Sequence, residues 1–386
     1  MNILFHCWEY PPRGSGIGRY IFHMSQALRD AGHFTVVITS HGDEGPTEEQ
    51  IENGVVYRSY RIEDIGTSLT TDLVIEKAKK HDVDWIEGVD HLGESAHLLS
   101  LKKRPPVVIK AHYNDVIKTA RYSQVCYSWQ RVLVDLACFR DRKRIARERR
   151  SLSHADLLIA PSERILREME KQDLVLAPLQ GLVPNPIPPL DNWVNKEGAF
   201  PTLLLVGRVD IGKGIEYLPR LVGSLISRFP ELRVEIAGGD SYARFIGSTK
   251  GWLINKMGDS KGSIKILGEL DRHALDEAYS RAWVVIVPSK WDTFPTVVLE
   301  AMIRGKAIVA SFNGGMPEML PGTSGKIVDP ARSDFSEAVA GFLFDRLRRE
   351  TVGRSAQHRA RSVYAPDRIA DTYINLLKTC GCDPLP

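Results

Sequence analysis

The 386-residue sequence has few cysteines and little net charge. Its five cysteines include no Cys-x-x-Cys pair, and an odd number cannot all pair, so we expect reduced thiols instead of a disulfide framework. One residue separates Cys380 from Cys382, and we interpret the two as separate thiols instead of a metal site. The formal net charge of +3 is too small to indicate a nucleic-acid-binding protein.

Long apolar segments are also absent. No apolar run approaches the roughly 20 residues that a membrane-spanning helix requires. A strand pattern begins at Ile3, without the basic region and long apolar core of a signal peptide before it. The apolar fraction of 43% is ordinary for a globular protein. We therefore expect a cytoplasmic enzyme.

Strand and helix patterns alternate from end to end, which predicts an α/β fold of two doubly wound, Rossmann-like domains. Strands are predicted at 3–5, 35–39, 55–58, 84–87, 107–110, 157–160, 202–206, 233–237, 264–267, 282–287 and 307–310. Helices are predicted at 18–31, 214–228, 296–304 and 366–379. The length exceeds what one hydrophobic core supports, and the proline-rich segment 183–190 lies near the middle. We predict an N-terminal domain at 1–185, a second domain at 186–365, and a final helix and tail at 366–386.

One strand-loop-helix turn contains two carboxylates. The apolar run 283–287 ends at Pro288, where a loop must start, and a helix is predicted from Thr296. Asp292 and Glu300 bracket this turn. Ligands bind at the carboxyl ends of strands in open α/β sheets, and a helix N-terminus attracts anions. The turn therefore predicts a phosphorylated ligand.

A second motif places two cations after another strand. Arg208 and Lys213 lie in the segment 207–214, between the strand at 202–206 and a predicted helix. Two fixed positive charges at the carboxyl end of a strand suit an anionic ligand. Taken alone, the motif is equally compatible with a solvated surface loop.

Together these motifs resemble those of retaining GT-B glycosyltransferases, especially glycosyltransferase family 4, and the resemblance covers nearly the whole chain. The segment 207–214 resembles the family's G-R-x4-K-G element, and 314–318 resembles its G-G-x-P-E loop. The segment 11–18 resembles its P-P-x-x-G-G-I-G loop, with Ser15 in place of the first glycine. The two carboxylates resemble its E-x7-E element, with Asp292 where the family usually has Glu.

The resemblance implies a GT-B fold, in which two Rossmann-like domains face a central cleft and a C-terminal helix crosses back to the N-terminal domain. It implies that Glu300 binds the ribose hydroxyls and that Asp292 faces the donor sugar. The implied catalytic residues are Arg208, Lys213, Asp292 and His112. The implied nucleotide and diphosphate site comprises Gly16, Arg208, Lys213, Gly238, Glu300, Thr296 and Val297. The implied donor-sugar site comprises His112, Asp292, Thr293, Phe294, Pro295, Gly314 and Gly315.

Two features of the first half have competing interpretations. The G-x-G-x-G pattern at 14–18 is not a dinucleotide fingerprint, because Tyr20 and Ile21 stand where the last glycine should be. This disfavours an NAD-dependent dehydrogenase. His112 directly follows a predicted strand, where a lone histidine is more often structural; its position in the family's pattern favours a sugar contact.

Asp82 and Asp84 form a D-x-D pattern like that of metal-dependent GT-A enzymes. The pattern precedes a predicted strand instead of ending one, so we interpret it as an ordinary acidic lead-in. We predict no metal and no cofactor, with a nucleotide-diphosphate sugar as donor substrate.

The segment 139–150 is strongly basic, with Arg140, Arg142, Lys143, Arg144, Arg147, Arg149 and Arg150. On a helix these side chains spread over much of the circumference, so a solvated face is the simpler interpretation. Such a segment also attracts anionic lipid head groups or a lipid-pyrophosphate acceptor. That alternative would place the protein peripherally on the inner face of the cell membrane.

We therefore predict a retaining glycosyltransferase that moves a sugar from a UDP- or GDP-sugar to a hydroxyl of a glycan, lipid-linked or small-molecule acceptor. Its expected role is bacterial cell-surface polysaccharide or glycoconjugate synthesis. No carboxylate is clearly placed as a nucleophile, so a front-face reaction is preferred, in which the leaving phosphate helps to deprotonate the acceptor. The alternatives are a nucleotide-sugar epimerase or hydrolase of the same fold, and a non-catalytic nucleotide-sugar-binding protein, which only Asp292 suggests.

Overall fold

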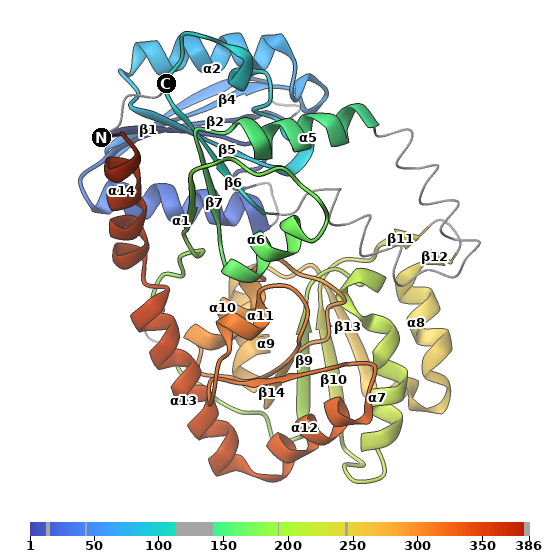
Figure 1. The fold of residues 1–386 in the computed structure, drawn as a ribbon. Coiled ribbons are helices and arrows are strands. Elements are labelled where there is room, and N and C mark those ends of the chain that lie inside the picture. Colours follow the sequence, from blue (N-terminus) through green and yellow to red (C-terminus); the bar gives the residue numbers. More distant parts are fainter. Residues whose placement is uncertain (13–15, 43–44, 113–141, 192, 244–245, 382–386) are drawn as a thin grey trace. The chain divides into compact units, whose positions relative to one another are not determined.

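The computed structural model describes residues 1–12, 16–42, 45–112, 142–191, 193–243 and 246–381. Some residues discussed above lie outside this set: Gly14 and Ser15 of the glycine-rich segment, three of the five cysteines (Cys126, Cys138 and Cys382), and 139–141 of the basic segment, which include Arg140. The chain divides into two units, Met1–Pro188 with Tyr364–Pro386, and Pro189–Val363, which are taken in turn (Figure 1). None of the helices in the described ranges is long and apolar enough to cross a membrane.

Within the described residues, the first unit contains an eight-stranded sheet of order β3-β4-β2-β1-β5-β6-β7-β8. Its strands are β1 (Asn2–His6), β2 (Phe34–Ser40), β3 (Thr47–Ile51), β4 (Gly54–Tyr60), β5 (Trp85–Val89), β6 (Val107–Lys110), β7 (Leu157–Ala160) and β8 (Gln180–Leu182). Neighbours are parallel except for the antiparallel β3–β4 pair. Most of the parallel strands are short, apolar and buried, as a sheet covered on both faces requires.

The helices of this unit are α1 (Gly16–Asp30), α2 (Ser68–Lys80), α5 (Arg142–His154), α6 (Glu163–Glu170) and α14 (Pro366–Gly381), with 3₁₀ turns η1 (Ile62–Asp64), η2 (His91–Gly93) and η3 (Leu98–Ser100). The helix α14 packs on α1. Its residues Ile369, Tyr373 and Leu377 are at most 2% exposed and belong to the core of the first unit. The predicted return of a C-terminal helix to the first domain is thus confirmed (Figure 1).

Polar side chains from four elements lie together inside the first unit: Tyr20 of α1, Glu87 of β5, Lys110 of β6 and Tyr373 of α14, each at most 1% exposed. The Lys110 ammonium donates to the Val183 carbonyl and lies 4.7 Å from the centre of the Tyr20 ring. Burial raises the pKa of Glu87 to about 7, although the Tyr373 phenol and the Lys110 ammonium oppose that rise. Burial also lowers the pKa of Lys110 to about 7.

The replacement Glu87→Gln is expected to change how stability depends on pH. A carboxyl group whose pKa is raised on folding stabilises the folded state fully when the pH is below the ordinary pKa of 4.5. That stabilisation is lost as the pH rises to about 7, the pKa in the folded state. The unfolding free energies of the variant and the wild type are to be compared by urea denaturation at both ends of this pH interval. Their difference should shift in favour of the variant by roughly 2–3 kcal/mol as the pH rises. Glu52→Gln, at an exposed carboxylate of the same unit, should show no gain; equal gains would contradict the burial argument.

Within the described residues, the second unit contains a six-stranded parallel sheet of order β13-β10-β9-β14-β15-β16. Its strands are β9 (Thr202–Val206), β10 (Arg233–Ala237), β13 (Ile264–Gly268), β14 (Val284–Val287), β15 (Ala307–Ser311) and β16 (Lys326–Val328). An antiparallel pair, β11 (Tyr242–Ala243) and β12 (Gly247–Ser248), follows β10. The apolar side chains of β9, β14 and β15 form much of the core, so the fold class predicted from the sequence is confirmed.

The helices of the second unit are α7 (Leu218–Leu225), α8 (Thr249–Met257), α9 (Arg272–Arg281), α10 (Thr296–Ile303), α11 (Met316–Met319), α12 (Ser333–Phe344) and α13 (Arg346–Val363), with 3₁₀ turns η4 (Ile211–Lys213), η5 (Ile215–Tyr217) and η6 (Gly258–Ser263). The helix predicted at 214–228 is therefore shorter than expected. Gly214 has a left-handed backbone with φ of 77°, and Pro219 in the first turn of α7 has no N–H to continue an earlier helix.

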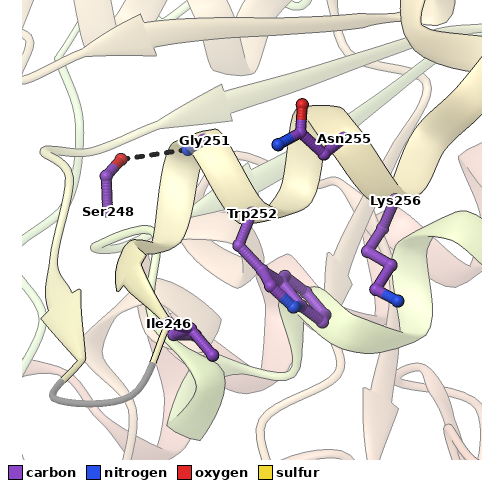
Figure 2. A pocket seen from close by; sticks show the side chains of 6 residues that line it. All are labelled: Ile246, Ser248, Gly251, Trp252, Asn255 and Lys256. Atoms are coloured by element: carbon purple, nitrogen blue, oxygen red, sulfur yellow. Dashed lines mark hydrogen bonds between the residues drawn. The ribbon is translucent and has the colours of Figure 1, made fainter.

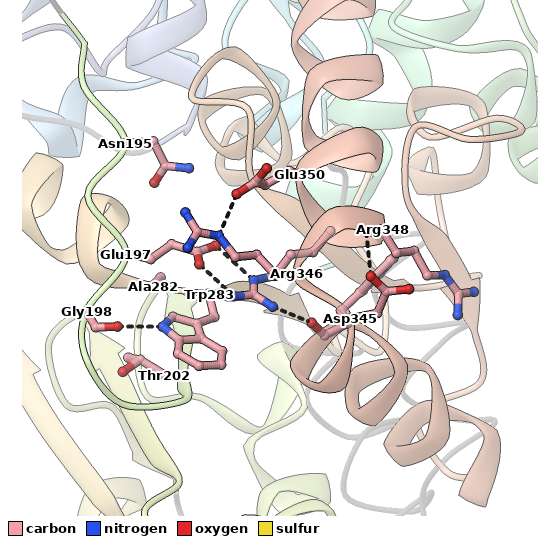
Figure 3. Close-up of polar contacts among 12 residues, drawn as sticks. Asn195, Glu197, Gly198, Thr202, Ala282, Trp283, Asp345, Arg346, Arg348 and Glu350 are labelled. Atoms are coloured by element: carbon pink, nitrogen blue, oxygen red, sulfur yellow. Dashed lines mark hydrogen bonds and ion pairs between the residues drawn. The ribbon is translucent and has the colours of Figure 1, made fainter.

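Polar contacts hold residues 193–198 against the rest of the second unit (Figure 3). Arg349 of α13 donates to both carboxylate oxygens of Glu197, at 2.9 and 2.6 Å. The Arg349 guanidinium also lies 4.3 Å from the centre of the Trp283 ring. The Trp283 indole donates to the Gly198 carbonyl at 2.8 Å. The segment that enters the second unit is thus fixed to that unit before β9 begins.

Candidate functional site

The strand order of the second sheet reverses between β9 and β14, which makes this position a topological switch point. β10 and β13 lie on one side of β9, whereas β14, β15 and β16 lie on the other. In open parallel sheets, ligands bind outside the carboxyl ends of the strands at such a reversal. The loops that follow β9 and β14 both contain predicted site residues, so this edge is the candidate site of the unit.

Backbone contacts hold these two loops together. The Lys290 amide donates to the Gly212 carbonyl at 2.9 Å. A Cβ at Gly214 would lie 2.0 Å from the Pro288 carbonyl oxygen, so a side chain at this position would separate the loops. Lys290 and Glu216 add an ion pair of 2.6 Å across the same contact. The two halves of the candidate site are therefore positioned by the fold itself.

Two predicted site residues form an ion pair at this contact. Lys213 Nζ lies 2.7 Å from Asp292 Oδ2, although 79 positions separate the residues in sequence. Asp210 accepts from the Gly212 amide at 2.7 Å and so caps η4, the turn that ends at Lys213. The Lys213 side chain is 33% exposed. Because an ammonium has three N–H donors, the contact with Asp292 leaves others for an anion.

The loop after β10 contacts the loop after β9. A Cβ at Gly238 would lie 2.0 Å from the Gly207 carbonyl oxygen, and the Val209 amide donates to the Gly239 carbonyl at 2.8 Å. Arg208 is exposed here, and its guanidinium forms no hydrogen bond or ion pair within the described ranges. These glycines have a packing role, and Arg208 supplies a cation beside Lys213 in the same loop.

Asp240 follows these glycines and contacts the first turn of the next helix, α8, whose N-cap residue is Ser248. Its carboxylate accepts from the Ser248 hydroxyl and from the Lys250 amide, the latter at 2.8 Å, and these contacts lower the pKa of Asp240. A cavity of about 440 Å³ lies beside α8 (Figure 2). It is lined by Ile246, Ser248, Gly251, Trp252, Asn255 and Lys256. Predicted site residues do not line this cavity, so it is separate from the candidate site.

Glu300 lies in the second turn of α10 and is 5% exposed. The Tyr279 hydroxyl donates to its carboxylate at 3.1 Å, and Arg304 donates to its carbonyl at 2.8 Å. Thr296 and Val297 are half-buried in the first turn, where backbone amides have no helical partner. The helix therefore offers amides at the loop and a carboxylate whose orientation is fixed by Tyr279.

The loop after β15 packs on the backbone of the turn that contains Asp292. The Gly315 amide donates to the carbonyls of Asp292 and Thr293, both at 3.1 Å. Gly314 has φ of 67°, and a Cβ there would lie 1.8 Å from the Asp292 carbonyl oxygen. The Thr293 hydroxyl is buried and has no hydrogen-bond partner in the described part of the chain. The same turn contains two further predicted residues, the buried Phe294 and Pro295.

The first unit contains the two remaining predicted residues. Gly16 is the exposed first residue of α1. His112 follows β6, is 7% exposed, and donates its backbone amide to Asp90 at 2.8 Å. Burial, together with the nearby Lys110 ammonium, lowers the pKa of His112 well below its ordinary value, so the ring is neutral. Its Nε2 atom is buried without a partner among the described residues.

Three acidic residues were not among the predicted site residues: Glu9 after β1, and Asp90 and Glu94 after β5. They follow the carboxyl ends of strands of the first sheet, as His112 does. The Trp8 amide donates to Glu94 at 3.0 Å, and the Tyr60 hydroxyl also donates to it, at 3.5 Å. Burial raises the pKa of Glu94 well above its ordinary value, and the charge of Glu9 adds to the rise. Their position directly after strands was the available signal, as it was for Asp292.

The D-x-D pattern lies at the opposite edge of this sheet. Asp84 accepts from the Asn2 amide at 2.7 Å, immediately before β5 begins at Trp85. The predicted site residues, in contrast, follow the carboxyl ends of strands. In the described ranges, no three His, Cys, Asp or Glu side chains gather as a metal site would require. The position of Asp84 agrees with an acidic lead-in.

Family models match both units. Residues 14–188 match Glycosyltransferase Family 4, and residues 191–359 match Glycosyl transferases group 1. The chain is a GT-B glycosyltransferase of the family 4 type. The resemblance inferred from its motifs is thereby confirmed.

Curated relatives of this glycosyltransferase align with part of it. Sulfoquinovosyl transferase SQD2 of Arabidopsis thaliana is 29% identical over 168 residues, which are 42% of this chain and 30% of that protein. A D-inositol 3-phosphate glycosyltransferase of Corynebacterium aurimucosum is 32% identical over 160 residues, which are 40% of this chain and 38% of that protein. The chain thus aligns with less than half the length of each of these relatives.

Solved structures resemble the glycosyltransferase over nearly its whole length. Sucrose-phosphate synthase from Thermosynechococcus elongatus superposes with a TM-score of 0.79 at 22% identity, covering 98% of both chains. The Anabaena protein HepE in complex with UDP-glucose superposes with a TM-score of 0.70 at 17% identity, covering 98% of this chain and all of HepE. At these identities the likeness establishes the fold.

In this glycosyltransferase, Gly314→Ala is expected to displace the Asp292 turn and to lower transfer by roughly 10- to 100-fold. The added methyl group would lie 1.8 Å from the Asp292 carbonyl oxygen. Gly322→Ala is a matched control, because Gly322 also has a positive φ, of 60°, but nothing lies within 4 Å of its Cβ. Transfer rates and melting temperatures should be compared. Equal losses of activity would show that backbone strain, and not the contact with Asp292, is responsible.

Proposed function

We propose that this glycosyltransferase moves a sugar from a UDP- or GDP-sugar to a hydroxyl of a glycan, lipid-linked or small-molecule acceptor, with retention at the anomeric carbon and without a metal. The observation that carries the proposal is the meeting of Lys213, Asp292 and the α10 N-terminus at the reversal of the second sheet. The complex of HepE with UDP-glucose supports the class of donor. The proposed biological role is bacterial cell-surface polysaccharide or glycoconjugate synthesis.

Each residue then has a physical task. Arg208 and Lys213 neutralise the diphosphate as the bond from the anomeric carbon to it breaks. The amides of Thr296 and Val297 bind phosphate oxygens, and Glu300 accepts from the ribose hydroxyls. Asp292 holds the Lys213 ammonium and faces the donor sugar, where Gly314 and Gly315 allow close approach. Gly16 and His112 of the first unit supply further contacts to phosphate and sugar.

The reaction is proposed to occur on one face of the sugar. Asp292 is paired with Lys213, and Glu300 is buried against Tyr279, so neither motif carboxylate is placed to attack the anomeric carbon. The acceptor oxygen therefore forms its bond on the face that the diphosphate leaves. The acceptor proton passes to a phosphate oxygen of the leaving group. This sequence conserves the anomeric configuration without a covalent intermediate on the enzyme.

The test is thermal denaturation with UDP, GDP, ADP, TDP and NAD in turn. A ligand at 100 times its dissociation constant adds about 2.7 kcal/mol of stability. One nucleoside diphosphate should raise the melting temperature of the wild type and of the surface control Arg361→Ala, but have much less effect on Arg208→Ala. The shift should persist with chelator. Stabilisation by NAD alone, or by none of these ligands, would contradict the proposal.

A further inference from the structure

A second candidate site lies on the face of α5 that carries Arg149 and Arg150. A cavity of about 490 Å³ is lined there by Ala146, Arg147, Arg149, Arg150, Ser153, His154 and Val175. Four of these seven residues are basic and none is acidic. The cavity belongs wholly to the first unit, because all of its lining lies between residues 146 and 175.

The cations of this cavity differ from two exposed arginines on other helices, which form ion pairs within their own helix. Arg167 pairs with Glu163 on α6 at 2.7 Å, and Arg346 pairs with Glu350 on α13 at 2.7 Å. The exposed Arg149 and Arg150 have no acidic or hydrogen-bonding partner for their guanidinium groups in the described part of the chain. Their charge is therefore available to an anion.

The acid nearest in sequence does not neutralise these arginines. Glu148 is fully buried and accepts from the Leu92 amide at 3.1 Å, so it faces into the unit. Arg147 packs its stem on Gly93, and its Nε atom is buried without a partner among the described residues. Arg147 and the exposed Arg149 and Arg150 thus all belong to the lining of one cavity, and the exposed guanidinium groups are those of Arg149 and Arg150.

An exposed apolar side chain completes the lining. Val175 is 74% exposed, although it comes from the segment after α6 and not from the basic run. A soluble phosphate ester would gain little from an exposed valine, whereas a bilayer presents phosphate and acyl chains together. Each Lys or Arg near an anionic membrane surface contributes about 1 kcal/mol of attraction. The combination of unpaired arginines and an exposed valine therefore fits a lipid surface better than a phosphate in solution.

We propose that the α5 cavity binds the phosphate of an anionic lipid head group and so holds the first unit at a bilayer surface. The structure alters the hypothesis drawn from the basic run 139–150. It turns Glu148 inward, and it adds His154 and Val175, which lie outside the run. The proposal is independent of the donor chemistry of the second unit.

Vesicle sedimentation tests the proposal with the full chain. Vesicles of phosphatidylcholine with phosphatidylglycerol should bind the wild type, and vesicles of phosphatidylcholine alone should not. The double replacement Arg149→Glu, Arg150→Glu should weaken binding by about 30-fold or more, since two attractive charges are lost. The double replacement Lys102→Glu, Lys103→Glu is the matched control, because it makes the same charge change at adjacent exposed lysines of the same unit. Val175→Ser should weaken binding without any change of charge.

Several outcomes would overturn the proposal. Equal binding to both vesicle types, or no binding to either, would exclude an anionic lipid site. Equal losses in the arginine and lysine variants would indicate attraction by net charge alone. Stabilisation by inorganic phosphate without vesicle binding would identify a soluble phosphate as the ligand. As a control, the arginine variant should keep the melting temperature of the wild type, which shows that it folds. It should also keep the wild-type response to the nucleoside diphosphate, so that weaker vesicle binding is not confused with failure of the proposed donor site.

Discussion

Replacing Lys213 with alanine is expected to lower the rate of sugar transfer by about 100- to 1,000-fold, the usual cost of removing one preorganised donor from a developing anion. Lys213 lies on a capped turn at the reversal of the second sheet, so its ammonium is held in place before a ligand arrives. The side chain is one-third exposed, which makes its loss cheap for the fold. The effect should therefore appear in the turnover number more than in stability.

The measurement is release of the nucleoside diphosphate from the nucleotide sugar whose nucleoside diphosphate stabilises the protein. Lys265→Ala, at an exposed lysine of β13, is the matched control and should retain full activity. A double-mutant cycle with Asp292→Asn separates two roles of Lys213. If Lys213 only holds Asp292, both single variants and the double variant should lose the same activity. A loss below about tenfold in Lys213→Ala would contradict a role at the leaving group.

Arg349→Ala is expected to destabilise the second unit by about 3–5 kcal/mol, because removal of one partner leaves a largely buried charge without its counterion. Arg349 is 3% exposed, and the Glu197 side chain that it binds is 17% exposed. The replacement also removes the contact with the Trp283 ring and the hydrogen bond to the Phe342 carbonyl, at 3.1 Å. Urea denaturation followed by tryptophan fluorescence would report the change directly.

Arg346→Ala provides the comparison on the same helix. Arg346 also forms an ion pair, with Glu350, but its side chain is 77% exposed, so we expect a loss below about 1 kcal/mol. Similar effects of the two replacements would mean that burial of the Arg349–Glu197 pair adds nothing to its contribution. Glu197→Gln should recover part of the stability lost in Arg349→Ala, because the unpaired charge is then gone.

Much of the second unit could be predicted from the sequence because its chemistry and its apolar pattern coincide. The apolar run 283–287 predicted the strand, and the acidic residues Asp292 and Glu300 on either side of the helix start indicated the candidate site. The contact of Lys213 with Asp292, in contrast, could not be predicted from the sequence. It depends on β9 and β14 being neighbours, which no spacing along the chain specifies.

The first unit shows where sequence patterns fail. β3 consists of Thr-Glu-Glu-Gln-Ile and is largely exposed, so no apolar alternation could indicate it. Glu87 and Lys110 appear in the sequence as ordinary charged residues, yet both are fully buried. Their burial follows from the packing of α14 and α1 on the sheet, which requires contacts between residues more than 250 positions apart. Such long-range packing is invisible to local periodicity.

The return of α14 to the first unit has a consequence for biosynthesis. Residues 189–363 form one continuous stretch, so the second unit can complete its core once that stretch has left the ribosome. The first unit is translated earlier but cannot bury Tyr20 and Glu87 fully until Tyr373 emerges. The domain that is made first is therefore finished last. A frameshift after codon 363 would damage the domain encoded at the opposite end of the reading frame.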